Sequence, residues 1–143
     1  MARYLVVANQ TLGADQLTAK IRECLAAGDA SFHVVVPATH AKDQMTWTEG
    51  AAHAIAEQRL EAALKRFRRL GAEADGEVGD PSPMLAIRDA LLEESYDAII
   101  LSTLPAGPSR WLKQDLPHRL ERTFGVPVVH LTGQYERVGA GED

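Results

Sequence analysis

Polar side chains follow several of the short apolar runs in this sequence. Asn9 and Thr11 come directly after the run at residues 4–8, and Ser102 and Thr103 come after the run at 97–101. Amide and hydroxyl groups are the donors and acceptors that orient a small ligand in a pocket. The sequence does not pair them with an evident general acid, base or activated nucleophile. These residues therefore predict a binding crevice, and no catalytic residue is predicted.

The familiar nucleotide and hydrolase signatures do not occur. After the first apolar run, residues 9–13 read Asn-Gln-Thr-Leu-Gly where a dinucleotide fold would carry G-x-G-x-x-G. The phosphate-loop pattern G-x-x-x-x-G-K-[ST] and the nucleophile-elbow pattern G-x-S-x-G are also absent from the sequence. Nicotinamide dehydrogenases, phosphate-loop ATPases and standard α/β-hydrolases are therefore disfavoured.

The histidines are too widely spaced to predict a metal site. His40 and His53 flank a polar stretch that holds Asp43 and Glu49, which makes a conceivable ligand set. Solvated loop residues are the favoured interpretation of all four. No metal site is predicted.

Other chemically active residues have ordinary structural explanations. Cys24 lies on the apolar face of an expected helix, which favours a buried, inert thiol over a nucleophile. His130 lies inside an expected strand and is interpreted as a structural histidine. Trp47 is either a lid over a ligand or a loop anchor, with the anchor favoured. The basic residues of 65–69 fit a solvated helix end better than a grip on an anion.

Five apolar runs alternate with four helical patterns, and these elements must position the crevice. The expected strands are 4–8, 32–36, 72–78, 97–101 and 126–131. The expected helices begin near residues 14, 49, 83 and 115. In the third, Ser82 is expected as the N-cap, and Met84, Ile87 and Leu91 are expected on the buried face. This alternation predicts βαβ units and a mainly parallel α/β sheet.

Ligands of such open sheets bind beyond the carboxyl ends of the strands, where the strand order reverses. We therefore place the candidate ligand site between the first and fourth expected strands and in the loop that follows the fourth. The candidate site residues are Ala8, Asn9, Thr11, Pro37, Ser102, Thr103, Leu104, Gly107, Ser109, Arg110 and Asp115.

Length and composition set the class of protein. The 143 residues fit one domain, expected over 1–133 with a flexible tail at 134–143. The formal net charge is −5, from 15 basic and 20 acidic residues, which argues against a nucleic-acid partner. A single cysteine and the lack of a long apolar run predict a cytoplasmic protein without a membrane partner.

Several local pieces, in this order, resemble the universal stress protein family along nearly the whole chain. They are the first strand and turn at residues 5–11, the turn Gly79-Asp80-Pro81, the strand ending at Ser102, and the Pro-containing last strand at 125–129. The resemblance implies a Rossmann-like, adenine-nucleotide-alpha-hydrolase-like open sheet of five parallel strands in the order 3-2-1-4-5, with four helices on its two faces.

The resemblance also implies a homodimer through the last strand, where Val126, Val128 and His130 lie. Local sequence agrees with this arrangement. The third expected strand is polar, with Glu73, Asp75 and Glu77 on alternate positions, as an open edge should be. The last strand is apolar on both faces, as an edge covered by a partner should be.

One departure from the family bears on function. ATP-binding members carry G-x-x-G after the fourth strand and G-[ST] later in the same loop, and we align these positions with Ser102, Pro105, Gln114 and Asp115. All three glycines are missing, and Asp115 would set a carboxylate at a helix start that otherwise receives a phosphate. That carboxylate can cap the helix itself. The family's first-strand Asp corresponds to Asn9.

Other residues of the same loop favour an anion site of a different kind. Gly107 and Ser109 could form a differently spaced anion nest, and Arg110 makes the loop locally basic. The favoured function is a non-enzymatic, universal-stress-like regulatory or ligand-sensing protein without conventional ATP binding and with no assigned cofactor. The alternatives are a member that binds ATP or AMP with magnesium through a modified loop, and an enzyme of another class on the same scaffold.

Overall fold

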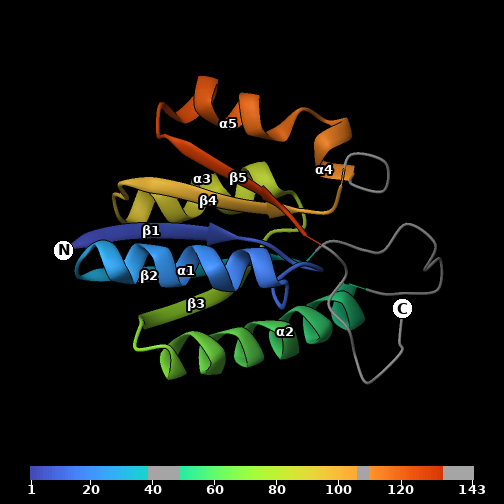
Figure 1. The fold of residues 1–143 in the computed structure, drawn as a ribbon. Helices are drawn as coiled ribbons and strands as arrows, with labels where there is room; N and C mark the ends of the chain where they lie inside the picture. Colours follow the sequence, from blue (N-terminus) through green and yellow to red (C-terminus); the bar gives the residue numbers. More distant parts are fainter. Residues whose placement is uncertain (39–48, 106–109, 134–143) are drawn as a thin grey trace.

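The computed structural model describes residues 1–38, 49–105 and 110–133, and they form a parallel five-stranded sheet between two layers of helices (Figure 1). The strand order is β3-β2-β1-β4-β5, which confirms the order expected from sequence. The strands are β1 (Ala2–Val7), β2 (Ala30–Pro37), β3 (Glu73–Gly79), β4 (Ala98–Thr103) and β5 (Val128–Thr132).

The central strands are apolar on consecutive positions because helices cover both of their faces. Leu5, Val6 and Val7 of β1 are fully buried, and so are Ile99, Ile100 and Leu101 of β4. In the register between these two strands, Val7 pairs with Leu101, so Ala8 and Ser102 follow side by side at the carboxyl edge.

The helices α1 (Asp15–Ala27) and α2 (Glu49–Arg69) pack on one face of the sheet. Their buried side chains, including Ile21 and Phe67, join Val6 and Ile100 in one apolar cluster. The helices α3 (Pro83–Glu93) and α5 (Leu116–Phe124) pack on the other face, in a second cluster with Leu5 and Leu101. Because all the strand pairs are parallel, the carboxyl ends of the five strands lie at one edge of the sheet.

Helix α3 begins as expected, but its buried face differs from the prediction. Ser82 is the N-cap and accepts a hydrogen bond from the Leu85 amide at 3.4 Å, with Pro83 at the first helical position. The buried residues are Pro83, Ala86, Ile87 and Ala90. Met84 and Leu91 are only partly buried beside this cluster. Small alanines fill the closest approach to the sheet, which a search for large apolar residues overlooks.

A one-turn helix between β4 and α5 was not expected. This helix, α4 (Arg110–Lys113), is too short to show a helical repeat of apolar residues. The last expected helix is confirmed as α5, which ends at Gly125 in the left-handed conformation. The expected strand at 126–131 is β5, beginning two residues later at Val128.

The edge strand β3 lies close to both β2 and α2 because of a glycine. A Cβ at Gly76 would stand 2.5 Å from the Val34 carbonyl oxygen and 2.7 Å from Leu60 Cδ1. The absence of a side chain lets Leu60 of α2 cover this part of the edge. Helix α2 is thereby held along β2 and β3, with its side chains reaching toward the end of β1.

Candidate functional site

Asn9 lies just beyond β1, at the point where the strand order reverses, and both ends of its side-chain amide are hydrogen-bonded. Its Nδ2 donates to the Pro37 carbonyl oxygen at the end of β2, 2.7 Å away. Its Oδ1 accepts from Nη1 of Arg59, which comes from α2. Only 6% of Asn9 is exposed, so these partners replace water around a buried amide.

Two arginines of α2 hold the turn between β1 and α1. Arg59 reaches Asn9, and Arg66 Nη1 donates to the Leu12 carbonyl oxygen at 3.2 Å. The two arginines are seven residues apart, which places them on one face of a helix. Sequence reasoning missed Arg59 altogether. It assigned Arg66 to a solvated helix end, which is wrong, because Arg66 is part-buried against the turn.

The hydroxyls of Thr11 and Ser102 bind one another at the carboxyl edge of the sheet, where the candidate site was expected. Their oxygens lie 2.6 Å apart, and each residue is exposed by 1%. Thr11 belongs to the turn after β1 and Ser102 to the end of β4, so this bond joins the two strands that flank the reversal of strand order. A ligand that used either hydroxyl would have to break the bond between them.

Thr103 and His130 make a second polar contact at the end of β4. The Thr103 hydroxyl donates to the Leu104 carbonyl oxygen at 2.8 Å and lies 2.8 Å from His130 Nε2. Because a hydroxyl has one proton, His130 Nε2–H must be the donor in the second bond. Burial lowers the pKa of His130 below its ordinary value, which favours the neutral ring.

Asp115 does not cap α5 as the sequence reasoning expected. Its backbone is left-handed, with φ 57° and ψ 40°, and its side chain makes no capping hydrogen bond. The carboxylate lies 3.0 Å from His118 Nδ1 and 3.9 Å from Arg122 Nη1, both on the surface of α5. This backbone differs from the extended backbone of a capping residue, whose side chain reaches the amides of the first turn. The expectation of a capping carboxylate is therefore wrong.

The structure brings most of the described candidate residues together. Ala8 and Leu104 are buried beside the polar residues, and the Ala38 amide donates to the Gly79 carbonyl oxygen at 3.1 Å beside Pro37. Gly107 and Ser109 lie outside the described residues, as do His40, Asp43, Trp47 and the expected tail. The side chains of Glu49 and Arg110 are also outside what the structure describes.

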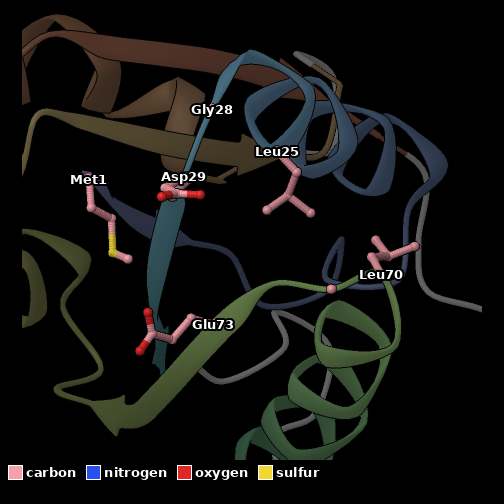
Figure 2. A pocket seen from close by; sticks show the side chains of 8 residues that line it. Met1, Leu25, Gly28, Asp29, Leu70 and Glu73 are labelled. Carbon is pink, nitrogen blue, oxygen red and sulfur yellow. The ribbon is translucent and has the colours of Figure 1, made fainter.

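An open cavity lies at the opposite, amino edge of the sheet (Figure 2). Its volume is about 350 Å³, with Leu25 and Leu70 facing it on one side and the carboxylates of Asp29 and Glu73 on the other. It shares no residue with the crevice, and its lining holds no nucleophile. Its position at the amino ends of the strands makes it an unusual place for a ligand of an open α/β sheet.

Within the described residues, no group of three His, Cys, Asp or Glu side chains can hold a metal ion. His53, which the sequence raised as a conceivable ligand, lies 3.5 Å from Glu57 on the surface of α2. Cys24 is buried, as expected, and burial raises the pKa of its thiol. No helix in the described part of the chain has the length and apolar character to span a membrane.

Comparison with known proteins finds a match in structure alone. No family model and no curated protein matches the sequence. The universal stress protein from Archaeoglobus fulgidus superposes with a TM-score of 0.63 over 91% of this chain and 93% of its own, at 16% identity. The fold is that of the universal stress proteins.

Two further solved structures agree. A universal stress protein in complex with cAMP has a TM-score of 0.60 and 14% identity, covering 93% of this chain and 98% of its own. A protein of the universal stress protein family from Burkholderia pseudomallei has a TM-score of 0.55 and 16% identity, covering 91% and 95%. At such identities the likeness shows the universal stress protein fold, whereas the ligand of this chain has to be argued from its own residues.

Proposed function

We propose that this chain is a non-enzymatic regulatory or ligand-sensing protein of the universal-stress type, and that it does not bind ATP in the conventional way. The main support for the proposal is that the polar side chains of the candidate site are hydrogen-bonded within the protein. Asn9 binds Pro37 and Arg59, while Thr11 and Ser102 bind one another. To bind a ligand, these side chains would have to break their hydrogen bonds within the protein. Breaking them would cancel most of the free energy that new hydrogen bonds to the ligand provide.

The loop after β4 supports the same proposal. The resemblance puts Ser102 where ATP-binding members have the first glycine of the phosphate loop. Here the Ser102 side chain is buried and points to Thr11, so it fills space that a glycine leaves to the ligand. Asp115 falls where the family has a hydroxyl residue, and its carboxylate is exposed at the start of α5. A second negative charge nearby would be repelled.

The non-enzymatic part of the proposal rests on Thr103 and His130. A hydroxyl beside an imidazole is the arrangement of an activated nucleophile. In this pair the Thr103 proton is given to the Leu104 carbonyl oxygen, so His130 Nε2–H is the donor rather than the base. The ring cannot take the hydroxyl proton in this geometry. The contact instead ties β5 to the end of β4.

An adenine-nucleotide ligand is the second candidate. A solved protein of the same fold is in complex with cAMP. In this chain the Arg59 guanidinium beside Asn9 gives the crevice a cation, and the loop sequence retains Gly107, Ser109 and Arg110. Binding of cyclic AMP, AMP and ATP with magnesium should be compared, because all three contain adenine and they differ in the charge of their phosphate groups.

We also propose a cytoplasmic homodimer formed through β5. This strand is one edge of the sheet, and its apolar side chains Val128, Val129 and Leu131 are only half-buried. An apolar edge that stays open invites uncontrolled pairing with other strands. Pairing with a second copy covers it. The other edge, β3, carries charges that make it unsuitable for the same contact.

Thermal unfolding with millimolar ATP–magnesium, AMP or cAMP tests the nucleotide part of the proposal. A ligand at 100 times its dissociation constant would stabilise the protein by about 2.7 kcal/mol, so binding is readily seen. We expect no shift with ATP–magnesium for the natural chain. A clear shift would overturn the proposal, and a shift with cAMP alone would favour the second candidate.

The variant Asp115→Ser tests the reason given for weak ATP binding. Removing the carboxylate should raise the response to ATP–magnesium if its charge opposes the phosphates. Asp89→Ser is a matched control, because Asp89 is also an exposed carboxylate but lies on α3 and pairs with Arg88. If ATP–magnesium stabilises both variants equally, the carboxylate at position 115 is not what opposes the phosphates.

A further inference from the structure

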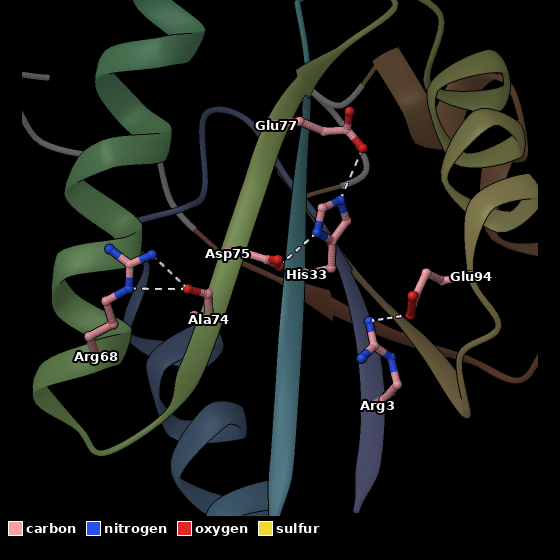
Figure 3. A network of polar contacts seen from close by, with 7 residues as sticks. All are labelled: Arg3, His33, Arg68, Ala74, Asp75, Glu77 and Glu94. Atoms are coloured by element: carbon pink, nitrogen blue, oxygen red, sulfur yellow. Dashed lines mark hydrogen bonds and ion pairs between the residues drawn. The ribbon is translucent and has the colours of Figure 1, made fainter.

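His33 lies on β2 with each ring nitrogen near a different carboxylate of the edge strand (Figure 3). Nδ1 is 2.8 Å from Asp75 Oδ1, and Nε2 is 3.0 Å from Glu77 Oε2. The register pairs His33 directly with Asp75, so both carboxylates lie on the side of the sheet to which His33 points. The imidazole therefore bridges two positions of β3.

This geometry requires a proton that a neutral ring does not have. A neutral imidazole has one N–H donor and one lone pair, whereas the imidazolium has two N–H donors. With two ionised carboxylates as acceptors, only the imidazolium satisfies both contacts. When the ring loses its proton, one nitrogen turns a lone pair toward a carboxylate, and that contact becomes repulsive.

The remaining charged groups around His33 do not replace the proton. Glu73 lies on the same side of β3, two residues before Asp75, and adds a third negative charge. The Tyr96 ring stacks on the His33 ring with centroids 6.3 Å apart. Arg3 of β1 lies over Tyr96 and is paired with Glu94 at 2.7 Å.

Helix α3 packs on the same face and carries the pair Arg88 and Asp89, which are bound to one another. Arg3 and Arg88, on two elements of this face, are thus each paired with a carboxylate, while β3 presents three carboxylates. Burial lowers the pKa of His33, but hydrogen bonds to Glu77 and Asp75 outweigh it, so the pKa is raised above its ordinary value of 6.5.

We propose that a proton on His33 clamps the edge strand β3 to β2, and that the edge loosens when this proton is lost. The other face of β3 is held differently, by Arg68 of α2, whose Nε and Nη2 donate to the Ala74 carbonyl oxygen at 3.1 and 2.8 Å. An arginine does not titrate in this range. Loss of the proton therefore weakens the His33 side of the strand alone.

The clamp also acts on the crevice through the backbone. Gly79 ends β3, two residues beyond Glu77, and its carbonyl oxygen accepts from the Ala38 amide. Pro37, next to Ala38, accepts from Asn9. The clamp does not require a nucleotide to be bound. The effect of the clamp is measured at the amides of β3.

Hydrogen exchange of the β3 amides that bond to β2, measured from pH 5.5 to 8.5 and corrected for intrinsic rates, tests the proposal. A clamp of raised pKa stabilises fully below the unfolded value near 6.5 and is lost as the pH rises through the folded value. The contacts are partly exposed, with side-chain exposures of 18% for His33, 77% for Asp75 and 47% for Glu77. We expect protection to fall about two- to fivefold, as for a contact open to solvent.

Three variants separate the clamp from general loss of charge. His33→Gln should abolish the pH dependence, and Asp75→Asn or Glu77→Gln should reduce it. Glu73→Gln is the matched control, since it neutralises a carboxylate of the same strand and should leave the dependence intact. Protection independent of pH in the natural chain, the same dependence in His33→Gln, or a His33 pKa below 6.5 by NMR titration would each overturn the proposal.

Discussion

Replacing Ser102 with alanine is expected to leave the Thr11 hydroxyl buried without a partner. The two oxygens are 2.6 Å apart, and each residue is exposed by 1%, so water does not readily take the missing place. An unsatisfied buried polar group costs about 1–3 kcal/mol. The variant should therefore lose about that much free energy of unfolding.

A double-mutant cycle measures the bond itself. Thr11→Val keeps the shape of Thr11 and removes its hydroxyl, so it should cost a similar amount alone. In the double variant Thr11→Val with Ser102→Ala, neither hydroxyl remains, and the loss should be clearly smaller than the sum of the single losses. The difference is the coupling of the two residues, about 1–2 kcal/mol for groups in direct contact.

Urea unfolding of the four proteins gives these free energies. Thr132→Val is a matched control, because Thr132 ends β5 and is exposed, and its loss should stay within about 0.5 kcal/mol. If folded Ser102→Ala is as stable as the natural chain and the coupling is zero, water replaces the lost hydroxyl. The contact would then be open to solvent, which contradicts the burial of the two hydroxyls.

Two further predictions concern the start of α5 and the β5 edge. Asp115→Gly should raise the free energy of unfolding by about 0.5–1 kcal/mol, because a left-handed backbone is strained for a residue with a side chain. Lower stability in urea unfolding would show that its contacts with His118 and Arg122 are worth more than the strain. Light scattering at high micromolar concentration should give the mass of a dimer, and a monomer mass throughout would contradict the β5 interface.

The order of the elements could be predicted because each strand and helix has its own local pattern. Consecutive apolar residues in β1 and β4 indicate strands covered on both faces, and Ser82 followed by Pro83 indicates a helix start. The charged alternation in β3 indicated an open edge, which the strand order confirms. Helix α4 was missed because four residues are too few for a repeat.

The candidate crevice could be predicted only in part. Asn9, Thr11 and Ser102 stand out because polar residues follow apolar strands, and the topology brings them together. Arg59 lies 50 residues from Asn9, and nothing local in the sequence of α2 shows which face turns toward β1. Asp115 was misjudged for a related reason. The sequence gives the residue at a helix start, but the backbone angle decides whether its carboxylate can reach the first amides.

Calorimetric titration of the natural chain with ATP–magnesium tests the central proposal most directly. The partners of Asn9, Thr11 and Ser102 lie within the protein, and Ser102 fills the place of a phosphate-loop glycine. We therefore predict no saturable heat up to millimolar nucleotide, where the free energy of binding would be only about −4 kcal/mol. A saturable isotherm with a micromolar dissociation constant would contradict the account.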